Sequence, residues 1–345
     1  MKAVVVREHG GVEKLNIEDT QKPEIRPDEV LVATKASGLN HLDLWVRKGV
    51  PGHKFPIPMT LGTDIAGEVV EVGELVRNAK VGDRVAVMPG FAEPTSEMAL
   101  SGQIHLARDY GIFGETRNGG CAEFLEVPAV NLMHMPDWMS FTDAAACPLV
   151  FLTAYHMLKK ADLQPGETVL MHAAGSGVTS AGIQIAKLFG ATVITTAGND
   201  EKLEKAKQLG ADYVVNYKTH DFVEEVKKIT GKAGVDMVFD HVGPDTFAGN
   251  MKVVRWGGRI VMCGSSSGGN VDLNLRALFF KRISLIGTTM GPKADQLRVW
   301  KLLCQKKLQP VVDKVFAVGD VRAAHEYVES RQAFGKVVLD TSKWA

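Results

Sequence analysis

The chain has 345 residues, of which 45% are hydrophobic and 23% are charged, and its 40 basic side chains balance its 40 acidic ones. This length and composition are enough for two hydrophobic cores, and they exclude a disordered chain. No net charge draws the protein to nucleic acid or to an anionic membrane surface. We therefore expect a small-molecule partner, with no nucleic acid and no membrane involved.

The cysteines and the first residues bear on the compartment. The four cysteines are widely spaced and form no C-x-x-C pair, which argues against a disulfide framework or a structural zinc site. The chain begins with strand-like residues rather than a charged leader, and no apolar run reaches membrane-spanning length. We expect a cytoplasmic protein.

The secondary-structure pattern changes along the chain. Short β-branched runs broken by Gly and Pro fill the first 127 residues, for example Val30–Ala33 and Gly67–Gly73, and predict a β-rich domain. After about residue 150, strand-like and helical stretches alternate, which predicts a parallel, doubly wound sheet. The expected strands are 168–172, 192–196, 213–215, 235–239, 259–262 and 283–287, with helices at 178–189, 200–209, 221–229 and 244–255. A helix at 293–308 and a strand at 335–340 follow.

A glycine-containing turn after the strand that ends at His172 leads directly into a helix. Glycines here let the backbone approach a pyrophosphate, and the start of the helix offers free N–H groups and a positive dipole end. The alternative is an ordinary strand-to-helix turn, and Thr179 or Ser180 replaces the usual last glycine. The expected cofactor-binding residues of this turn are Gly175, Ser176, Gly177, Val178 and Thr179.

The end of the next strand bears on the choice of dinucleotide. An acidic side chain there would bind the ribose 2′-hydroxyl of NAD and repel a 2′-phosphate. Gly198 stands at that position, followed by Asn199 and, in the next helix, by Lys202. We expect NADPH/NADP⁺ rather than NADH, although Lys202 alone is equally consistent with a solvated helix charge, and Asp200 and Glu201 lie nearby.

Several segments together resemble the medium-chain dehydrogenase/reductase superfamily, in its zinc-independent quinone oxidoreductase and alcohol dehydrogenase-like branch. They are Gly38–Asp43, Leu61–Asp64, Phe151–Tyr155, the glycine-containing turn, Ser330-Arg331 and Gly335-Lys336. The resemblance implies an α/β protein with a GroES-like β-rich catalytic domain (1–150 plus 290–345) and a Rossmann domain with a doubly wound parallel sheet (151–289). It also implies a homodimer or homotetramer, with pairing of strands near 283–288.

The same resemblance bears on zinc. Alcohol dehydrogenases of this superfamily place Cys, His and Cys as zinc ligands where this chain has Asn40, Thr63 and Leu149, and Leu42 stands at the position of their proton-relay hydroxyl. These residues cannot rebuild an open Cys–His–Cys zinc site. The cysteines of the structural zinc lobe are replaced by Glu93, Ser96, Ala99 and Ala107. We expect no zinc.

Without a Lewis acid, hydride transfer favours an acceptor that already delocalises negative charge, such as a quinone or a bulky or conjugated ketone. Asn40 is the leading candidate to donate a hydrogen bond to the developing oxyanion, with loop hydrogen bonding as its alternative role. Asp43 and Asp64 are candidates to orient neighbours or to shuttle a proton through water, with structural hydrogen bonding as the alternative role. Thr63 and Trp45 are candidate pocket residues, a core position being the alternative for Trp45.

The resemblance also implies further cofactor contacts: His41 near the pyrophosphate, Thr153 near the nicotinamide, and Lys202, Tyr217 and Arg331 around the 2′-phosphate. Ligands of such sheets bind beyond the carboxyl ends of the strands. Loops in those positions are expected to border the nicotinamide through Val242, Cys263, Gly264, Ser265 and Met290.

These observations predict a zinc-independent, NADPH-dependent oxidoreductase that transfers hydride to a quinone or ketone. Two alternatives stay open. One is an NADPH-dependent reductase of an enone or enoyl C=C bond. The other is a weakly catalytic protein that senses NADPH.

Overall fold

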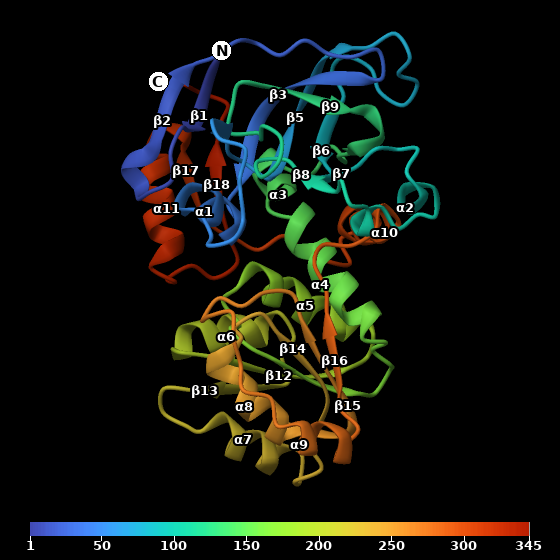
Figure 1. Cartoon of the computed structure of the whole chain (residues 1–345), viewed down its shortest axis with the longest axis vertical. Helices are drawn as coiled ribbons and strands as arrows, with labels where there is room; N and C mark the ends of the chain where they lie inside the picture. The colour runs from blue at the N-terminus through green and yellow to red at the C-terminus, as the bar shows by residue number, and fades with distance from the viewer. Residues whose placement is uncertain (345) are drawn as a thin grey trace. The chain divides into compact units, whose positions relative to one another are not determined.

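The computed structural model describes residues 1–344 and divides into two compact units (Figure 1). The first unit combines residues 1–150 with the chain from residue 292 onward, and the second is residues 151–291. The blue N-terminal and red C-terminal segments therefore belong to one unit. Among the described residues, no helix combines the length and apolar character needed to cross a membrane.

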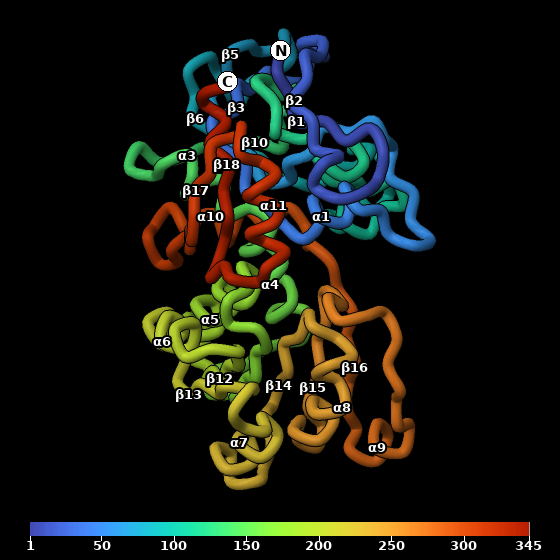
Figure 2. The backbone as a smooth tube through the Cα atoms, turned by 90° about the vertical axis from the view of Figure 1, so that its left-hand side faces the viewer, coloured from blue at the N-terminus to red at the C-terminus, as the bar shows by residue number. Residues whose placement is uncertain are grey.

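The first unit is built on a seven-stranded sheet of order β10-β6-β5-β3-β18-β17, with β9 also paired to β3. The C-terminal strand β18 pairs with β3 in antiparallel register, and β17 pairs with the other side of β18 in parallel register (Figure 2). The strands are β3 (Glu29–Gly38), β5 (Asp64–Val72), β6 (Arg84–Val87), β9 (Phe124–Pro128), β10 (Leu132–His134), β17 (Val312–Ala317) and β18 (Lys336–Asp340). The pairing of β18 with β3 joins segments that are 300 or more residues apart in the sequence, such as Gly38 and Val338.

Two smaller sheets complete the unit: β1 (Lys2–Val6), β2 (Leu15–Asp19) and β4 (Met59–Thr60) in one, and β7 (Gly90–Phe91) with β8 (Gly111–Ile112) in the other. The β-branched runs noted in the sequence provide the core, since Val30, Val32 and Val69 are fully buried in one hydrophobic cluster. Burial of such side chains is the main stabilising contribution to the unit.

The predicted β-rich domain also contains helices, of which α10 corresponds to the helix predicted at 293–308 and the others were not predicted. They are α1 (His41–Lys48), α2 (Glu97–Leu100), α3 (Phe141–Ala145), α10 (Lys293–Cys304) and α11 (Val321–Glu329), with 3₁₀ turns at η1 (Val12–Lys14), η2 (Ile104–Leu106), η3 (Ala129–Asn131) and η4 (Val318–Asp320). Helix α1 begins because Asn40 is its N-cap and the Asp43 carboxylate accepts a hydrogen bond from the Asn40 backbone N–H at 2.8 Å. This is one half of a capping box, a signal present in the sequence.

The second unit is a six-stranded parallel sheet of order β13-β12-β11-β14-β15-β16. Its strands are β11 (Thr168–Met171), β12 (Thr192–Ala197), β13 (Tyr213–Asn216), β14 (Val235–Asp240), β15 (Val254–Met262) and β16 (Ser284–Gly287). Its helices are α5 (Gly177–Leu188), α6 (Asp200–Gln208), α7 (Phe222–Ile229), α8 (Pro244–Val253) and α9 (Leu275–Phe280). The predicted α/β fold class, with a GroES-like β-rich domain and a doubly wound parallel sheet, is confirmed.

Some predicted boundaries are wrong. The helix predicted at 244–255 ends at Val253, because β15 already begins at Val254. The helix predicted at 293–308 ends at Cys304, and Lys306 then takes a left-handed φ of 58° that a helix cannot continue. Helix α4 (Pro148–Lys160), which contains the boundary between the units, and α9 were not predicted.

Candidate functional site

The three positions that hold zinc ligands in alcohol dehydrogenases converge in the first unit around one carboxylate. Asp64, next to Thr63, accepts a hydrogen bond from the Leu149 backbone N–H at 2.8 Å through Oδ1, and one from Asn40 Nδ2 at 3.0 Å through Oδ2. The antiparallel register of β3 and β5, which sets Gly38 opposite Asp64, brings the first two segments together. Asp64 is fully buried.

A lysine from the far end of the chain completes this cluster. Lys336 Nζ donates to the Leu39 carbonyl at 2.7 Å, to Asn40 Oδ1 at 2.5 Å and to Asp64 Oδ2 at 2.9 Å. All three N–H bonds of the ammonium are used, and its side chain is only 4% exposed. A buried ion pair is tolerated when its remaining hydrogen-bonding groups are satisfied in this way.

Asn40 is oriented by that cluster. Its side-chain amide donates to Asp64 and, at 3.3 Å, to the Gly38 carbonyl, while its Oδ1 accepts from Lys336. Both amide hydrogens therefore already have acceptors within the protein. The amide donor that we expected to reach the substrate is engaged, and the contacts are those of the alternative, loop-holding role.

Asp43 joins two loops. It is fully buried, with Oδ1 accepting from the Gly62 backbone N–H at 3.1 Å and Oδ2 accepting from Asn40 N. Burial raises the pKa of Asp43 to about 6, against the opposing effects of these hydrogen bonds and of the Lys336 charge. Gly62 has a φ of 105°, and a Cβ there would lie 2.5 Å from Cys121 N, so the loop needs glycine.

The other predicted residues of the first unit occupy different environments. Thr63 is fully buried, and within residues 1–344 its hydroxyl has no hydrogen-bond partner. Trp45, on α1, is 40% exposed, so it is not a core tryptophan. Desolvation, followed by the positive charges of Arg331 and Lys336, lowers the pKa of His41. The Arg331 guanidinium therefore lies near enough to His41 for its charge to disfavour protonation of the imidazole.

The structure shows how the lobe without cysteines is held. The Glu93 backbone N–H donates to Asp109 Oδ2 at 2.7 Å, and Ser96 caps α2 by accepting from Ala99 N at 3.2 Å. Ala107 caps η2 through its backbone N–H. Over the described part of the chain, no group of three or more His, Cys, Asp or Glu side chains is arranged to hold a metal ion.

In the second unit, the glycine-containing turn joins β11 to α5. Ser176 caps α5 through its hydroxyl, which accepts from Val178 N at 3.2 Å. Thr179, at the usual third-glycine position, is fully buried; its hydroxyl donates to the His172 carbonyl at 2.7 Å and lies 3.0 Å from His241 Nε2. Threonine thus fits close helix–strand packing by bonding to the strand.

Tyr217 and Lys218 line the space beside Gly198, at the end of β12. A Cβ at position 198 would lie 2.8 Å from the Tyr217 hydroxyl and 3.2 Å from Lys218 Cε. A side chain at 198 would require the exposed Tyr217 side chain to shift. Asn199 caps α6 by accepting from the Lys202 backbone N–H at 2.9 Å. Lys218 was not predicted from the sequence, although it directly follows Tyr217.

The two nearby acids are engaged elsewhere. Asp200 accepts from Asn216 Nδ2 at 2.8 Å, and Glu201 pairs with Lys205 at 2.8 Å. Each of these carboxylates thus has a protein partner at one of its two oxygens. Across residues 1–344, the Tyr217 hydroxyl and the Lys218 ammonium have no hydrogen-bond or ion-pair partner.

The remaining predicted loops lie at the carboxyl ends of neighbouring strands. Asp240 Oδ1 accepts from Val242 N at 2.7 Å, and a Cβ at Gly264 would lie 3.5 Å from His241 Cβ, so the loops after β14 and β15 adjoin. Ser265 also lies against Gly243. Thr153 Oγ1 is 4.0 Å from Met290 Sδ. Burial raises the pKa of Cys263 to about 12, so its thiol stays protonated.

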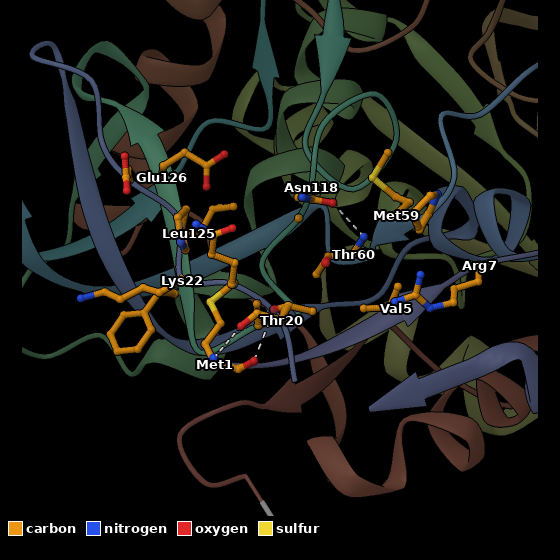
Figure 3. Close-up of a pocket in the computed structure, with 17 residues that line it drawn as sticks. Met1, Val5, Arg7, Thr20, Lys22, Met59, Thr60, Asn118, Leu125 and Glu126 are labelled. Carbon is orange, nitrogen blue, oxygen red and sulfur yellow. Dashed lines mark hydrogen bonds between the residues drawn. The ribbon is translucent and has the colours of Figure 1, made fainter. Parts of the chain in front are cut away.

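A separate cavity of about 510 Å³ in the first unit contains none of the predicted site residues. Figure 3 shows labelled lining residues from β1, β4, β9 and the loops between them. Polar groups in its lining bond to one another: Met1 N donates to the Thr20 carbonyl at 2.8 Å, and Thr60 N donates to Asn118 Oδ1 at 3.0 Å (Figure 3). Nothing in this lining selects a ligand.

Comparison with known proteins places the chain among oxidoreductases. The family model of the alcohol dehydrogenase GroES-like domain matches residues 26–137, and that of zinc-binding dehydrogenases matches 177–305. A quinone oxidoreductase of Salmonella typhimurium is 32% identical, over 96% of this chain and 97% of its own length. A crotonyl-CoA carboxylase/reductase of Cereibacter sphaeroides is 32% identical, over 90% of this chain and 80% of its own.

A crystal structure described as an NAD-dependent alcohol dehydrogenase superposes with a TM-score of 0.95, at 45% identity, over 99% of both chains. The chain belongs to the medium-chain dehydrogenase/reductase superfamily. It is an oxidoreductase of that type, with a fold suited to a pyridine nucleotide.

Proposed function

We propose that this protein is a zinc-independent, NADPH-dependent oxidoreductase that transfers hydride to a quinone or to a bulky or conjugated ketone. The carrying observation is the Lys336–Asp64–Asn40 cluster. Asn40, at the first ligand position, and Asp64, next to Thr63 at the second, both bond to the buried Lys336 ammonium. Leu149, at the third position, contributes its backbone N–H to Asp64. A zinc ion needs three protein ligands with an open position, and these residues do not supply them.

The acceptor class follows from the missing Lewis acid. A metal would stabilise the developing alkoxide by several kcal/mol, and here hydrogen bonds must do so. Quinones and conjugated ketones reduce that demand, because they delocalise the charge. Simple aliphatic alcohols and ketones fit poorly.

The residues of the second unit fit a dinucleotide, which supplies the hydride when bound. The N–H groups at the start of a helix such as α5 suit a pyrophosphate, and Thr153, whose Oγ1 lies 4.0 Å from Met290 Sδ, supports a nicotinamide site at these two residues. Tyr217 and Lys218 are free donors beside Gly198, where NAD-binding sheets carry an acid. Together with Lys202, they support NADPH. The predicted roles of His41 and Arg331 stay predictions.

The test measures dissociation constants of NADPH and NADH by nucleotide fluorescence, then NADPH oxidation with quinones, cyclic ketones and enones. Zinc is measured in untagged protein. We expect tighter NADPH binding, turnover of quinones or conjugated ketones, and no dependence on zinc. Tighter NADH binding would overturn the cofactor assignment, and the likeness to the 45%-identical NAD-dependent alcohol dehydrogenase favours that alternative. Stoichiometric zinc whose removal abolishes activity would overturn the mechanism.

Reduction of an enone or enoyl C=C bond is the second candidate, because a crotonyl-CoA carboxylase/reductase is among the relatives. Product analysis with an enone separates the two: an allylic alcohol supports carbonyl reduction, and a saturated ketone supports C=C reduction. Tight NADPH binding without turnover of any acceptor would instead favour a sensor.

We further propose a homodimer or homotetramer formed through the edge strand β16. This strand leaves one side of the sheet unpaired, and large apolar side chains of the same unit are well exposed, including Trp256, Phe279, Phe280 and Leu285. Sedimentation of the wild type and of Leu285→Lys tests it, since the charge should favour the monomer. Monomeric wild-type protein contradicts the proposal.

A further inference from the structure

The threonine at the usual third-glycine position makes a contact that a glycine could not make. Thr179 is fully buried in the first turn of α5, and its Oγ1 lies 2.7 Å from the His172 carbonyl and 3.0 Å from His241 Nε2. A carbonyl only accepts, so the single hydroxyl proton points to His172, and the Thr179 oxygen accepts from the Nε2–H group of His241. The bond therefore fixes the orientation and the tautomer of the His241 imidazole.

This bond crosses the place where the order of the parallel sheet reverses. Strands β11 and β14 are neighbours, and the chain continues from them in opposite directions, to β12 and to β15. Ligands of such sheets bind beyond the carboxyl ends of the two strands that flank this point. Thr179 stands in the helix that follows β11, and His241 directly follows β14. The two residues thus join the two sides of the expected binding region within the second unit.

The loop that contains His241 is also joined to the next loop through its backbone. The His241 carbonyl accepts from Ser266 N at 3.1 Å, and the Val242 carbonyl accepts from Ser267 N at 2.9 Å. A Cβ at Gly264 would lie 3.5 Å from His241 Cβ. Fixing the His241 side chain therefore also restrains the segment after β15, which carries residues expected to border the nicotinamide.

We infer that the Thr179–His241 hydrogen bond positions the nicotinamide half of the cofactor by holding the loop after β14 against the first turn of α5; this rests on the dinucleotide site of the proposed function. Both are positioning residues, since Thr179 acts through His241, and His241 acts through the backbone of its loop. The pyrophosphate half would bind at the start of α5 whether or not this bond is present.

Two ligands separate this role from a general effect on folding, because NADPH carries the nicotinamide and 2′-phospho-ADP-ribose lacks it. Both dissociation constants are measured by titration calorimetry for the wild type, Thr179→Val and Thr179→Ser. Valine keeps the shape and loses the bond, so NADPH binding should weaken about tenfold, while binding of 2′-phospho-ADP-ribose should stay within about twofold. Serine keeps the hydroxyl and should hold NADPH binding within about threefold of the wild type.

A double-mutant cycle tests the bond itself. His241→Leu removes the Nε2 donor from the other side, so it should weaken NADPH binding to the same extent as Thr179→Val. If one bond carries both effects, the double variant should bind NADPH about tenfold more weakly than the wild type, rather than about a hundredfold. His241→Gln places an amide N–H near the position of Nε2 and should restore part of the affinity.

Thr195→Val is the matched control. Thr195 is fully buried in β12, and its hydroxyl donates to the Met171 carbonyl at 2.8 Å, so it makes the same kind of bond to β11 from the neighbouring strand. Its loss leaves a buried carbonyl without that donor and should lower the unfolding temperature, as in Thr179→Val. Both dissociation constants should stay unchanged, because the loop after β14 keeps its contacts.

Four results overturn the inference: unchanged NADPH affinity in Thr179→Val, equal weakening of both ligands, additive losses in the double variant, or an equal loss of NADPH affinity in Thr195→Val. If NADH binds more tightly than NADPH, only the cofactor assignment fails, and the same cycle with NADH and ADP-ribose tests the bond. A protein that binds neither nucleotide overturns the proposed function, and this inference with it.

Discussion

Two fully buried aspartates, Asp64 in the first unit and Asp240 in the second, are satisfied differently. Asp64 in the first unit pairs with the Lys336 ammonium at 2.9 Å. Asp240 in the second unit accepts only from neutral groups: Val242 N at 2.7 Å, Thr246 Oγ1 at 2.6 Å and Asn250 Nδ2 at 2.8 Å. His172, which bonds to Asn250 at 2.7 Å, has its pKa lowered by burial and stays neutral.

The contrast shows two ways of fixing loops around a site. The first unit uses an ion pair and orients an amide where other members of the superfamily hold a metal. The second uses dipoles, which order the loops after β11 and β14 without placing a cation beside Asp240. Removing a partner from the first cluster leaves a buried charge unpaired. Removing a partner from the second leaves a buried hydrogen-bond donor or acceptor unsatisfied.

Lys336→Met should have the largest effect, since it leaves the Asp64 carboxylate buried without its cation. We expect a loss of about 3–5 kcal/mol in the free energy of unfolding, measured by urea denaturation. Lys336→Met with Asp64→Asn should recover part of it, because the unpaired charge is gone. A loss below about 1 kcal/mol would show that the pair is not the main support of this cluster.

Asp43 in the first cluster makes the free energy of unfolding depend on pH. Its folded pKa of about 6 lies above the ordinary value of 3.8, so the native state binds a proton more tightly than the unfolded chain. Its stabilising contribution is present below about pH 4 and is lost as pH rises through 6, by about 2–3 kcal/mol. Unfolding of wild type and Asp43→Asn at pH 4, 5, 6 and 7 isolates this difference. A difference independent of pH contradicts it.

Asp240→Asn tests the neutral cluster. The new amide turns one acceptor oxygen into a donor that faces other donors, so we expect a loss of about 1–3 kcal/mol in unfolding free energy. Dinucleotide affinity should fall as well, because Val242 is released from its anchor. Equal losses in Asp240→Asn and Lys336→Met would erase the proposed distinction between the two clusters.

Lys218→Met should have the smallest effect and acts on binding alone. NADPH affinity should fall by about 1–2 kcal/mol, since a charge-assisted contact at a solvent-exposed site is lost, and NADH affinity should not change. Lys252→Met, on the exposed side of α8, is the control for general charge. Parallel loss of both nucleotides contradicts a 2′-phosphate contact.

Local patterns predicted much of the fold. The β-branched runs and the glycine turn are signals within about ten residues, so the strands of the second unit and the start of α5 follow directly from them. Helix α1 was missed although the Asn40 and Asp43 capping signal is equally local. Helix α8 was overextended because the apolar residues at its end continue into β15.

The residue types of the candidate site were visible, but their partners were not. The loss of zinc ligands at three positions follows from identity alone, whereas the engagement of the Asn40 amide depends on groups from three segments. Lys218 was overlooked because its relation to Gly198 arises from the pairing of β12 with β13.

The sequence by itself determined the two-part α/β organisation, the glycine-containing turn before α5 and the absence of Cys and His at the three positions where related alcohol dehydrogenases hold zinc, because periodicity and residue chemistry are local. Only the tertiary structure decided which groups surround those three positions. Lys336 reaches Asn40 across 296 residues of sequence because β18 pairs with β3, and no local pattern encodes that pairing. The pairing of β3 with β5 brings Asp64 to the Asn40 amide, whose hydrogens are then taken by Asp64 and by the Gly38 carbonyl.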